Sequence, residues 1–187
     1  WLTKVNDPAN IGNDLFGMEL KYNVPTLPNI QAQFNGNISQ IDWKSTDGEG
    51  QQYGYSYDPM NRLLEAKYFN QADPTNKNGR FNEKIWNDDL NAAYDLNGNI
   101  LGIERRGRIS EVNAPAAYDL MDNLRYAYIG NQLLKVDDLT NVGNGFKNGD
   151  NGDNDYLYDH NGNMIQDKNK DIDGATSSTG NSVITYN

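Results

Sequence analysis

The segment Tyr94-Asp95-Leu96-Asn97-Gly98-Asn99-Ile100 carries the pattern that decides the fold of this 187-residue chain. The same pattern, Tyr-Asp-x-x-(Gly/Asn)-x-aliphatic, recurs at residues 57–63 and 158–164. Looser copies lie at residues 33–38 and 126–133, and residues 184–187 match the start of a sixth copy. Recurrence of this kind indicates a repeat protein, in which each unit packs on its neighbours along the chain.

The spacing between the copies is irregular, because the aromatic anchors of successive copies lie 23 to 37 residues apart. The intervening stretches, such as residues 73–79 and 144–152, are rich in Asn, Asp and Gly, which is typical of loops. We therefore expect hairpin units of constant size joined by loops of variable length. Residues 1–33 are interpreted as an N-terminal flanking segment and residues 34–187 as the repeats, the last of them truncated.

Each copy predicts a β-hairpin, and a comparison of the copies selects its turn. The pair Asn97-Gly98 alone favours a two-residue type I′ turn. The copy with Asp58-Pro59 instead fits a type I turn followed by a residue with positive φ, which is Gly or Asn in every strict copy. In that register each repeat Tyr lies opposite the aliphatic residue of its own copy, and we expect each Tyr also to pack against the next repeat. The positions assigned this structural role are Tyr57, Asp58, Leu63, Tyr94, Asp95, Gly98, Ile100, Tyr128, Gly130, Leu133, Tyr158, Asp159, Gly162 and Met164.

Strand alternation places tyrosines on one face of the predicted sheet. They are Tyr53, Tyr55, Tyr57, Tyr126, Tyr128, Tyr156 and Tyr158. The same alternation places aliphatic residues of the returning strands on the opposite face, namely Leu64, Leu101, Ile103 and Ile165. We therefore expect an all-β fold of tandem antiparallel hairpins that form a curved or spiralling sheet, open as a fragment of a shell.

Composition excludes several classes of function. The chain has 16 basic and 26 acidic side chains and a formal net charge of −10. Without a basic cluster it is a poor partner for nucleic acid, whose binding depends on local positive charge. There is no Cys and a single His, so cysteine chemistry and His-rich metal cages are excluded. Hydrophobic residues make up 36% of the chain, beside 29 Asn and 18 Gly, so we expect a thin core and many turns.

Candidate sites for chemistry have a simpler explanation in the turns. Asp95 and Asp159 begin segments that resemble the start of a calcium loop, but the Gly and Glu of that loop are not at the required positions. His160 lies at a predicted turn tip, where an exposed residue without a catalytic role is expected. Three acidic residues, Asp150, Asp153 and Asp155, suggest a solvated loop more than a weak cation site. We therefore predict a chain that is not an enzyme, with no catalytic residue, no cofactor and no metal.

The repeated units at residues 57–63, 94–100 and 158–164 resemble RHS or YD repeats, and the resemblance extends over most of the chain from Phe34 onward. It implies a spiralling β-ribbon that forms the wall of a hollow shell in large secreted or cell-surface proteins. In bacteria such shells enclose a C-terminal toxin, and in animal teneurins a similar barrel takes part in adhesion. The Asp-Pro-x-Gly type motif that the family uses for self-cleavage is missing, so neither protease nor toxin activity is carried over.

The resemblance implies a structural segment that contributes to a β-shell enclosing or presenting a C-terminal effector. Its expected partners are neighbouring repeats of the same parent chain, with an effector cargo or a surface glycan in addition. Neither nucleic-acid binding nor membrane insertion is expected, because no apolar run reaches the length of a membrane span. The alternative is a cell-surface adhesion or carbohydrate-binding module, in which the tyrosine rows with Trp43 and Trp86 stack on sugar rings.

Overall fold

Antiparallel strands in two units, residues 1–84 and 85–187, make up the structure of this chain. The structure is a computed structural model and describes residues 1–111, 114–149, 152, 154–173 and 182–183. In the described part of the chain the helical segments are single turns, α1 (Pro74–Lys77) and η1 (Lys168–Lys170). The predicted all-β class with tandem antiparallel hairpins is therefore confirmed.

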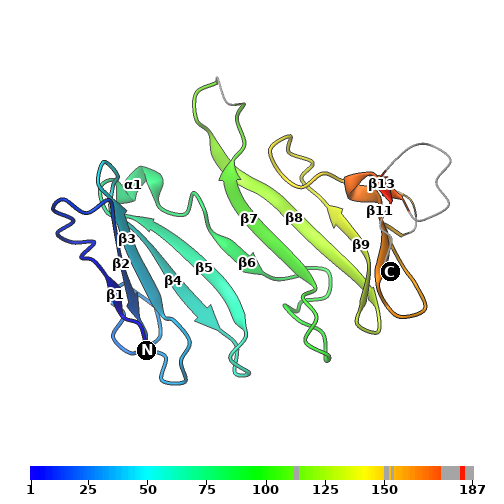
Figure 1. The fold of residues 1–187 in the computed structure, drawn as a ribbon, viewed down its shortest axis with the longest axis horizontal. Helices are drawn as coiled ribbons and strands as arrows, with labels where there is room; N and C mark the ends of the chain where they lie inside the picture. The colour runs from blue at the N-terminus through cyan, green and yellow to red at the C-terminus, as the bar shows by residue number, and fades with distance from the viewer. Residues whose placement is uncertain (112–113, 150–151, 153, 174–181, 184–187) are drawn as a thin grey trace. The chain divides into compact units, whose positions relative to one another are not determined.

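The first unit is an antiparallel sheet whose strands pair in chain order (Figure 1, blue to green). The strands are β1 (Lys4–Val5), β2 (Phe16–Lys21), β3 (Gln40–Ser45), β4 (Gln51–Tyr57), β5 (Leu63–Asn70) and β6 (Glu83–Ile85), whose last residue already belongs to the second unit. The repeat at residues 57–63 supplies the turn between β4 and β5. The looser copy at residues 33–38 lies in a loop before β3 and not in a hairpin.

The second unit contains a long antiparallel meander and a smaller sheet (Figure 1, green to red). The meander consists of β7 (Gly102–Arg108), β8 (Tyr118–Ile129) and β9 (Gln132–Asp138). The smaller sheet consists of β10 (Tyr156–Tyr158), β11 (Met164–Asp167), β12 (Ile172–Asp173) and β13 (Ser182–Val183), with β12 and β13 parallel. Among the described residues no pairing joins the first and last strand of either unit, so these sheets are open.

The core is thin, as the composition predicts. The buried hydrophobic side chains are Ala66, Tyr68, Ile85, Ala93, Leu124, Val136 and Tyr156. In the described part of the chain the buried polar residues outnumber these: Ser39, Gln40, Asp42, Asn70, Asn87, Asp122, Asp138, Asp155 and Asp167. Because a buried polar group is costly unless it is hydrogen-bonded, this fold depends on partners for these side chains. Among the described residues no helix is long and apolar enough to span a membrane.

The apolar cluster of the second unit lies on the tyrosine face of its sheet. Leu124 and Val136 are its buried members on β8 and β9, and Tyr126 packs against them. Ile103 of β7 also packs against this cluster and is the register partner of Leu124. The expectation that Ile103 lies on the face opposite the tyrosines is therefore wrong.

The pairing of β7 with β8 decides the face of Ile103, because it sets Ile103 opposite Leu124. A separate irregularity, a bulge in the returning strand, occurs in the other three hairpins. In the β4–β5 hairpin Tyr57 pairs with Leu63 while Ser56 pairs with Glu65, so Leu64 is an extra residue without a partner. The β8–β9 and β10–β11 hairpins contain the same irregularity, with the extra residues Leu134 and Ile165. An extra residue inverts the alternation of every following side chain, because the period of a strand is two. In these three hairpins the returning strand therefore turns its later residues toward the tyrosine face.

Candidate functional site

The turn of the first strict repeat is organised by the carboxylate of Asp58. One oxygen, Oδ1, accepts hydrogen bonds from the backbone N–H groups of Met60 (2.9 Å) and Arg62 (2.8 Å). The backbone N–H of Asn61 donates to the carbonyl of Asp58, and the N–H of Asp58 donates to the carbonyl of Arg62. The second oxygen, Oδ2, accepts from Nε of Arg62 at 2.6 Å. Asp58 thereby closes a type I turn with a bulge, as the sequence predicts.

The other two strict repeats have the same turn with the same bond lengths. The carboxylates of Asp95 and Asp159 each accept from the N–H two residues ahead (2.9 Å) and four residues ahead (2.8 Å). The amides of Asn99 and Asn163 replace the guanidinium of the first copy. The fourth turn residue has positive φ in all three copies: 65° at Asn61, 89° at Gly98 and 83° at Gly162. The predicted requirement for Gly or Asn at this position is confirmed.

These hydrogen bonds hold the turn aspartates in their charged form. For Asp159, the amide of Asn163 is the main cause of a pKa below the ordinary value, followed by the backbone bond from the same residue. For Asp58 and Asp95, partial desolvation raises the pKa, but the combined hydrogen bonds from the turn outweigh it and the net pKa is lowered. These carboxylates are therefore occupied by their own turns and are poorly suited to general acid–base chemistry.

The predicted cross-strand register is also observed. The repeat Tyr lies opposite the aliphatic residue of its own copy in all four hairpins, with the pairs Tyr57–Leu63, Tyr94–Ile100, Tyr128–Leu133 and Tyr158–Met164. The looser copy at residues 126–133 uses a different turn. Its strands are joined by the two residues Gly130-Asn131, and of these only Gly130 has positive φ. That pattern is typical of a type II′ hairpin. The residues 184–187 of the sixth copy lie outside the described part of the chain.

A tyrosine hydroxyl connects each of three repeats to the repeat before it. The phenol O–H donates to the backbone carbonyl of the aliphatic position in the preceding copy. The three bonds are Tyr57 to Ile38 (2.7 Å), Tyr128 to Ile100 (2.8 Å) and Tyr158 to Leu133 (2.9 Å). The sequence predicts packing of each Tyr against the next repeat, whereas the hydroxyl reaches the preceding one. The repeated Tyr is thus both a cross-strand packing residue and a connector between repeats.

A second connection runs in the opposite direction. The residue before the aliphatic position uses its side-chain amide to reach the turn of the following copy. Nδ2 of Asn37 donates to the carbonyl of Asn61 at 3.2 Å, and Nδ2 of Asn99 donates to the carbonyl of Gly130 at 3.3 Å. Asn37 belongs to the looser copy that forms no hairpin, yet it keeps this contact. Inter-repeat hydrogen bonds therefore persist where the local secondary structure differs.

The aromatic row of the first unit is stacked on itself. The ring of Trp43 lies 5.5 Å from that of Tyr53 at an interplanar angle of 17°, and Tyr53 lies 6.0 Å from Tyr55 at 26°. Tyr68 meets Tyr53 edge to face at 5.6 Å. Burial raises the pKa of both Tyr53 and Tyr55 to about 12, with the neighbouring charges as a smaller cause. Ring faces that stack on one another are less available to a sugar ring, so this row is better suited to packing.

Side chains from loops cover strand edges in both units, a role that sequence reasoning missed. The N–H of Tyr68 donates to Oδ1 of Asn82 at 2.8 Å, and the N–H of Asp138 donates to Oδ1 of Asn148 at 3.0 Å. The N–H of Val136 donates to the carboxylate of Asp155 at 2.8 Å. The abundance of Asn is the only sign of this role in the sequence, and by itself it also predicts turns. These side chains protect sheet edges that would otherwise invite pairing with other strands.

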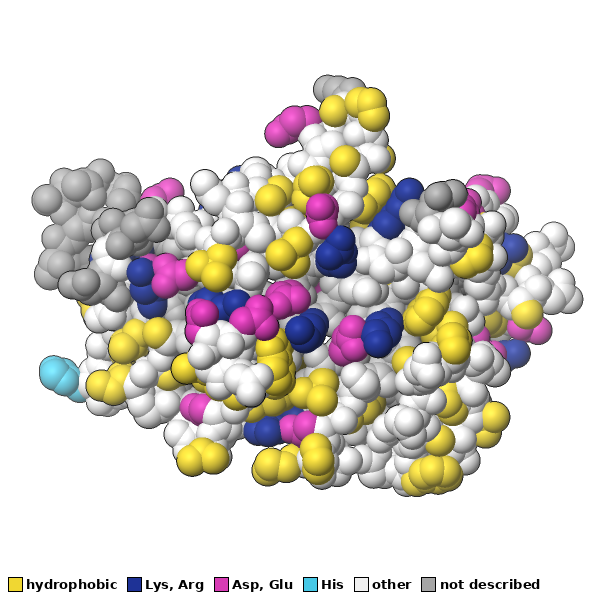
Figure 2. All heavy atoms as spheres, turned by 180° about the vertical axis from the view of Figure 1, so that it is seen from behind, with side chains coloured by type: hydrophobic (Ala, Val, Ile, Leu, Met, Phe, Trp, Pro, Cys, Tyr) yellow, Lys and Arg dark blue, Asp and Glu magenta, His cyan; other side chains and the backbone are white. Residues whose placement is uncertain are grey.

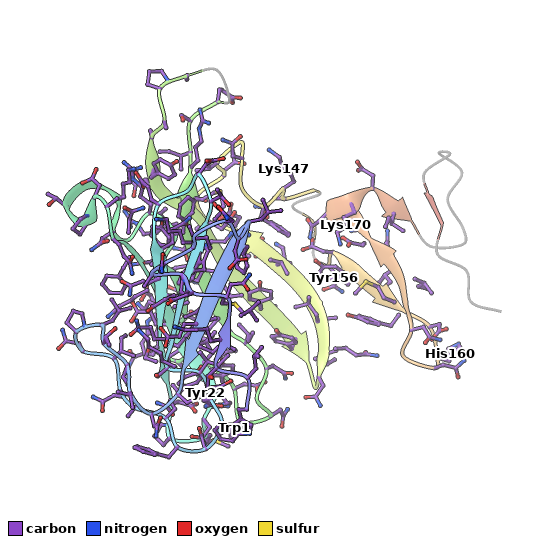
Figure 3. The ribbon with its side chains drawn as sticks, turned by 60° about the vertical axis from the view of Figure 1, so that its left-hand side comes forward. Trp1, Tyr22, Lys147, Tyr156, His160 and Lys170 are labelled. Atoms are coloured by element: carbon purple, nitrogen blue, oxygen red, sulfur yellow. The ribbon has the colours of Figure 1, made fainter. Side chains whose placement is uncertain are left out.

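Two further predictions about charged residues have different outcomes. Asp155 is 1% exposed, so the expectation of a solvated loop is wrong for this residue, which is buried as a hydrogen-bond acceptor. Asp150 and Asp153 lie outside the described part of the chain. His160 is exposed near the tip of the β10–β11 hairpin, as predicted (Figure 3). Within the described ranges no group of three or more His, Asp or Glu is arranged to hold a metal ion.

The surface charges are mixed in sign. Figure 2 shows Lys and Arg side chains lying next to Asp and Glu side chains on the visible face. Ion pairs between exposed or half-buried side chains include Arg106–Asp119 (2.7 Å) and Lys135–Asp137 (2.9 Å). Basic side chains that are paired with carboxylates offer little attraction for a phosphate backbone.

Comparison with known proteins does not extend this description. No protein-family model matches the chain, and no curated protein matches it either. The class that the fold and the repeated contacts define is an all-β protein of tandem hairpins with hydrogen bonds between successive repeats.

Proposed function

We propose that this chain is a non-catalytic structural segment of an RHS/YD-type secreted or surface protein. In this proposal its hairpins contribute to a β-shell that encloses or presents a C-terminal effector. Its partners are the neighbouring repeats of the parent chain. The proposal rests on the resemblance of the Tyr-Asp repeats and on what those residues do in the fold.

The observation that carries the proposal is the recurring tyrosine hydroxyl bond. In three repeats the hydroxyl of the motif Tyr donates to the backbone carbonyl of the aliphatic position in the preceding copy, at 2.7–2.9 Å. The chain separations differ, at 19, 28 and 25 residues, because the loops between repeats differ in length. A contact that is kept while the loops vary supports a role for the motif in joining repeats into a wall.

The state of the motif side chains supports a function without catalysis. Each turn aspartate accepts three hydrogen bonds within its own turn. The repeat tyrosines donate to backbone carbonyls or pack on one another. Catalysis requires a singular group that is poised to react, whereas these groups recur and are internally satisfied. The self-stacked aromatic row likewise favours packing over the carbohydrate-binding alternative.

Sequencing of the reading frame on both sides of this chain tests the proposal first. We expect further Tyr-Asp repeats, an upstream secretion signal and a downstream core motif that precedes a variable tail. A reading frame that ends within a few tens of residues on either side would contradict the shell.

Limited proteolysis of the full-length parent protein tests the enclosing role directly. We expect the C-terminal tail to be protected in the wild type and cleaved faster in the Tyr128→Phe variant, which loses an inter-repeat bond. The Tyr126→Phe variant is the matched control, because in the described structure the hydroxyl of Tyr126 makes no hydrogen bond. A tail that is equally accessible in all three proteins would refute enclosure by this wall.

A further inference from the structure

A cleft in the first unit is distinct from the repeated motif. It has a volume of about 430 Å³ and lies between β2 and the segment that follows it. Its walls include Glu19 and Lys21 of β2 and the side chains of Tyr22 and Val24. This volume is within the range of small-molecule sites, about 300–1,000 Å³.

The ammonium group of Lys21 in this cleft already has hydrogen-bond partners within the protein. Nζ of Lys21 donates to Oδ2 of Asp42 at 2.5 Å and to Oγ1 of Thr26 at 3.2 Å. Its remaining neighbour is the carboxylate of Glu19 at 3.7 Å, which is beyond hydrogen-bond distance. Lys21 therefore has little capacity left for an anionic ligand.

The carboxylate of Glu19, unlike the ammonium group of Lys21, is not engaged in hydrogen bonds within the described structure. Among the described residues it accepts no hydrogen bond, and its side chain is 34% exposed. Lys4, which lies opposite Glu19 in the β1–β2 register, donates instead to Asp7 at 3.2 Å. Of the charged residues that line the cleft, Lys21 is shared between Glu19 and Asp42, which does not itself line it. The three groups together carry one surplus negative charge, which favours a cation beside Glu19.

The rest of the lining is mixed, because the polar residues Thr3, Asn23 and Thr26 lie beside Leu20, Tyr22 and Val24. Val24 is aliphatic, and Tyr22 contributes a ring whose hydroxyl donates to the carbonyl of Leu2 at 2.8 Å. Leu20 lies between Glu19 and Lys21 on β2, so its side chain lies on the opposite face of the strand. Trp1 braces that ring with a centroid separation of 5.1 Å, and both residues lie at one end of the first unit in Figure 3. An aromatic ring beside a carboxylate attracts an ammonium group, and Tyr22 with Val24 offers apolar surface for a short hydrocarbon chain.

From this arrangement we propose that the cleft binds a primary alkylammonium group, with Glu19 accepting its hydrogen bonds and the Tyr22 side packing on its aliphatic chain. The same chemical group occurs in free diamines and in the side chain of a lysine residue. The site does not depend on the Tyr-Asp motif, so its failure would leave the proposed structural function intact.

NMR titration of the isotope-labelled chain with cadaverine tests this proposal. We expect saturable shifts of backbone amides around Tyr22 and Val24 in the millimolar range. The Glu19→Gln variant should weaken binding about tenfold or more, because a charge-assisted hydrogen bond is lost. The matched control is Glu65→Gln on β5, which removes the same charge from the same unit and should change the affinity by less than about twofold.

Two additional probes complete the test. Pentanol, a neutral molecule of similar length, should bind much more weakly than cadaverine. N-acetyl-lysine methylamide distinguishes the source, because tighter binding than cadaverine assigns the site to a protein lysine and weaker binding assigns it to a free amine. The proposal is overturned by shifts that do not saturate, by equal losses in the two glutamate variants, or by pentanol that binds as tightly as cadaverine.

Discussion

Removal of one hydroxyl group, in the Tyr128→Phe variant, should measurably destabilise the second unit. The phenol of Tyr128 donates to the carbonyl of Ile100 at 2.8 Å and belongs to a part-buried contact between two repeats. The substitution keeps the ring and its stacking on Tyr126, at a centroid distance of 6.5 Å, and deletes the hydrogen bond alone. Its effect therefore measures the inter-repeat bond.

The expected cost follows from the energetics of a single hydrogen bond. A neutral intramolecular bond contributes about 1 kcal/mol net, and the carbonyl that is left behind regains part of this from water because the site is only partly buried. A loss of about 1 kcal/mol lowers the folding equilibrium constant about fivefold. With a urea m-value of about 2 kcal/mol/M, the unfolding midpoint should fall by about 0.5 M.

Equilibrium urea unfolding followed by far-UV circular dichroism provides the assay. The matched control is Tyr126→Phe on the same strand, since in the described structure the hydroxyl of Tyr126 has no hydrogen-bond partner. We expect its midpoint to equal that of the wild type or to lie slightly above it. Equal destabilisation by both substitutions, or an unchanged midpoint in Tyr128→Phe, would refute the role of this bond.

Three further perturbations have defined outcomes. Gly98→Val should cost more than about 1 kcal/mol in thermal unfolding, because φ is +89° at this position, whereas the exposed Leu96→Val in the same turn should be nearly neutral. Arg105→Ala should lower the free energy of unfolding in urea by about 2 kcal/mol, because the fully buried Asp122 loses the guanidinium partner that lies 2.6 Å away. Arg106→Ala is its control, since it breaks an exposed ion pair and should cost less than about 1 kcal/mol. Alkaline titration should unfold the chain as pH rises from about 10 to about 12. Burial raises the pKa of Tyr53, Tyr55 and Tyr126 to about 12, so the stability that comes from their neutral phenols is fully present below pH 10 and is lost as pH rises toward 12. Circular dichroism and tyrosinate absorbance should change together there, and full ionisation near pH 10 with an intact sheet would contradict the burial of Tyr53, Tyr55 and Tyr126.

The turn and its register could be predicted because their causes lie within seven consecutive residues. Asp accepts the N–H groups of its own turn, Pro59 has the required φ, and Gly98 tolerates positive φ. Comparison of the copies then distinguished between two turn types that a single copy leaves open. The local pattern therefore determines which Tyr faces which aliphatic residue.

The side on which later residues lie could not be predicted in the same way. The face of Ile103 depends on the pairing of β7 with β8, in which Ile103 lies opposite Leu124, and a single strand of sequence does not contain that pairing. The acceptor of each tyrosine hydroxyl was missed for a related reason, because it lies 19 to 28 residues away across a loop of variable length. The sequence predicts a solvated Asp155, because nothing in a short acidic loop indicates that this side chain accepts from Val136 at the edge of β9.

The cleft beside Glu19 was also absent from the sequence prediction. It lies in the segment before residue 34, where no repeat draws attention to individual residues. Its character depends on which charges are already paired, and alternation along β2 shows that Glu19 and Lys21 share a face but not that Asp42 occupies the lysine. Which of the two carboxylates, Asp42 or Glu19, binds Lys21 is decided only when β2 and β3 pair in the folded sheet.

The tyrosine bond has a direction that bears on how such a chain is made. In all three cases the donor belongs to the later copy and the acceptor to the earlier one. During synthesis from the N-terminus, the carbonyl of Ile100 is therefore already outside the ribosome when Tyr128 emerges. Each new hairpin can dock on a finished template, so the chain can be assembled vectorially, one copy at a time, with no need to wait for its last residue.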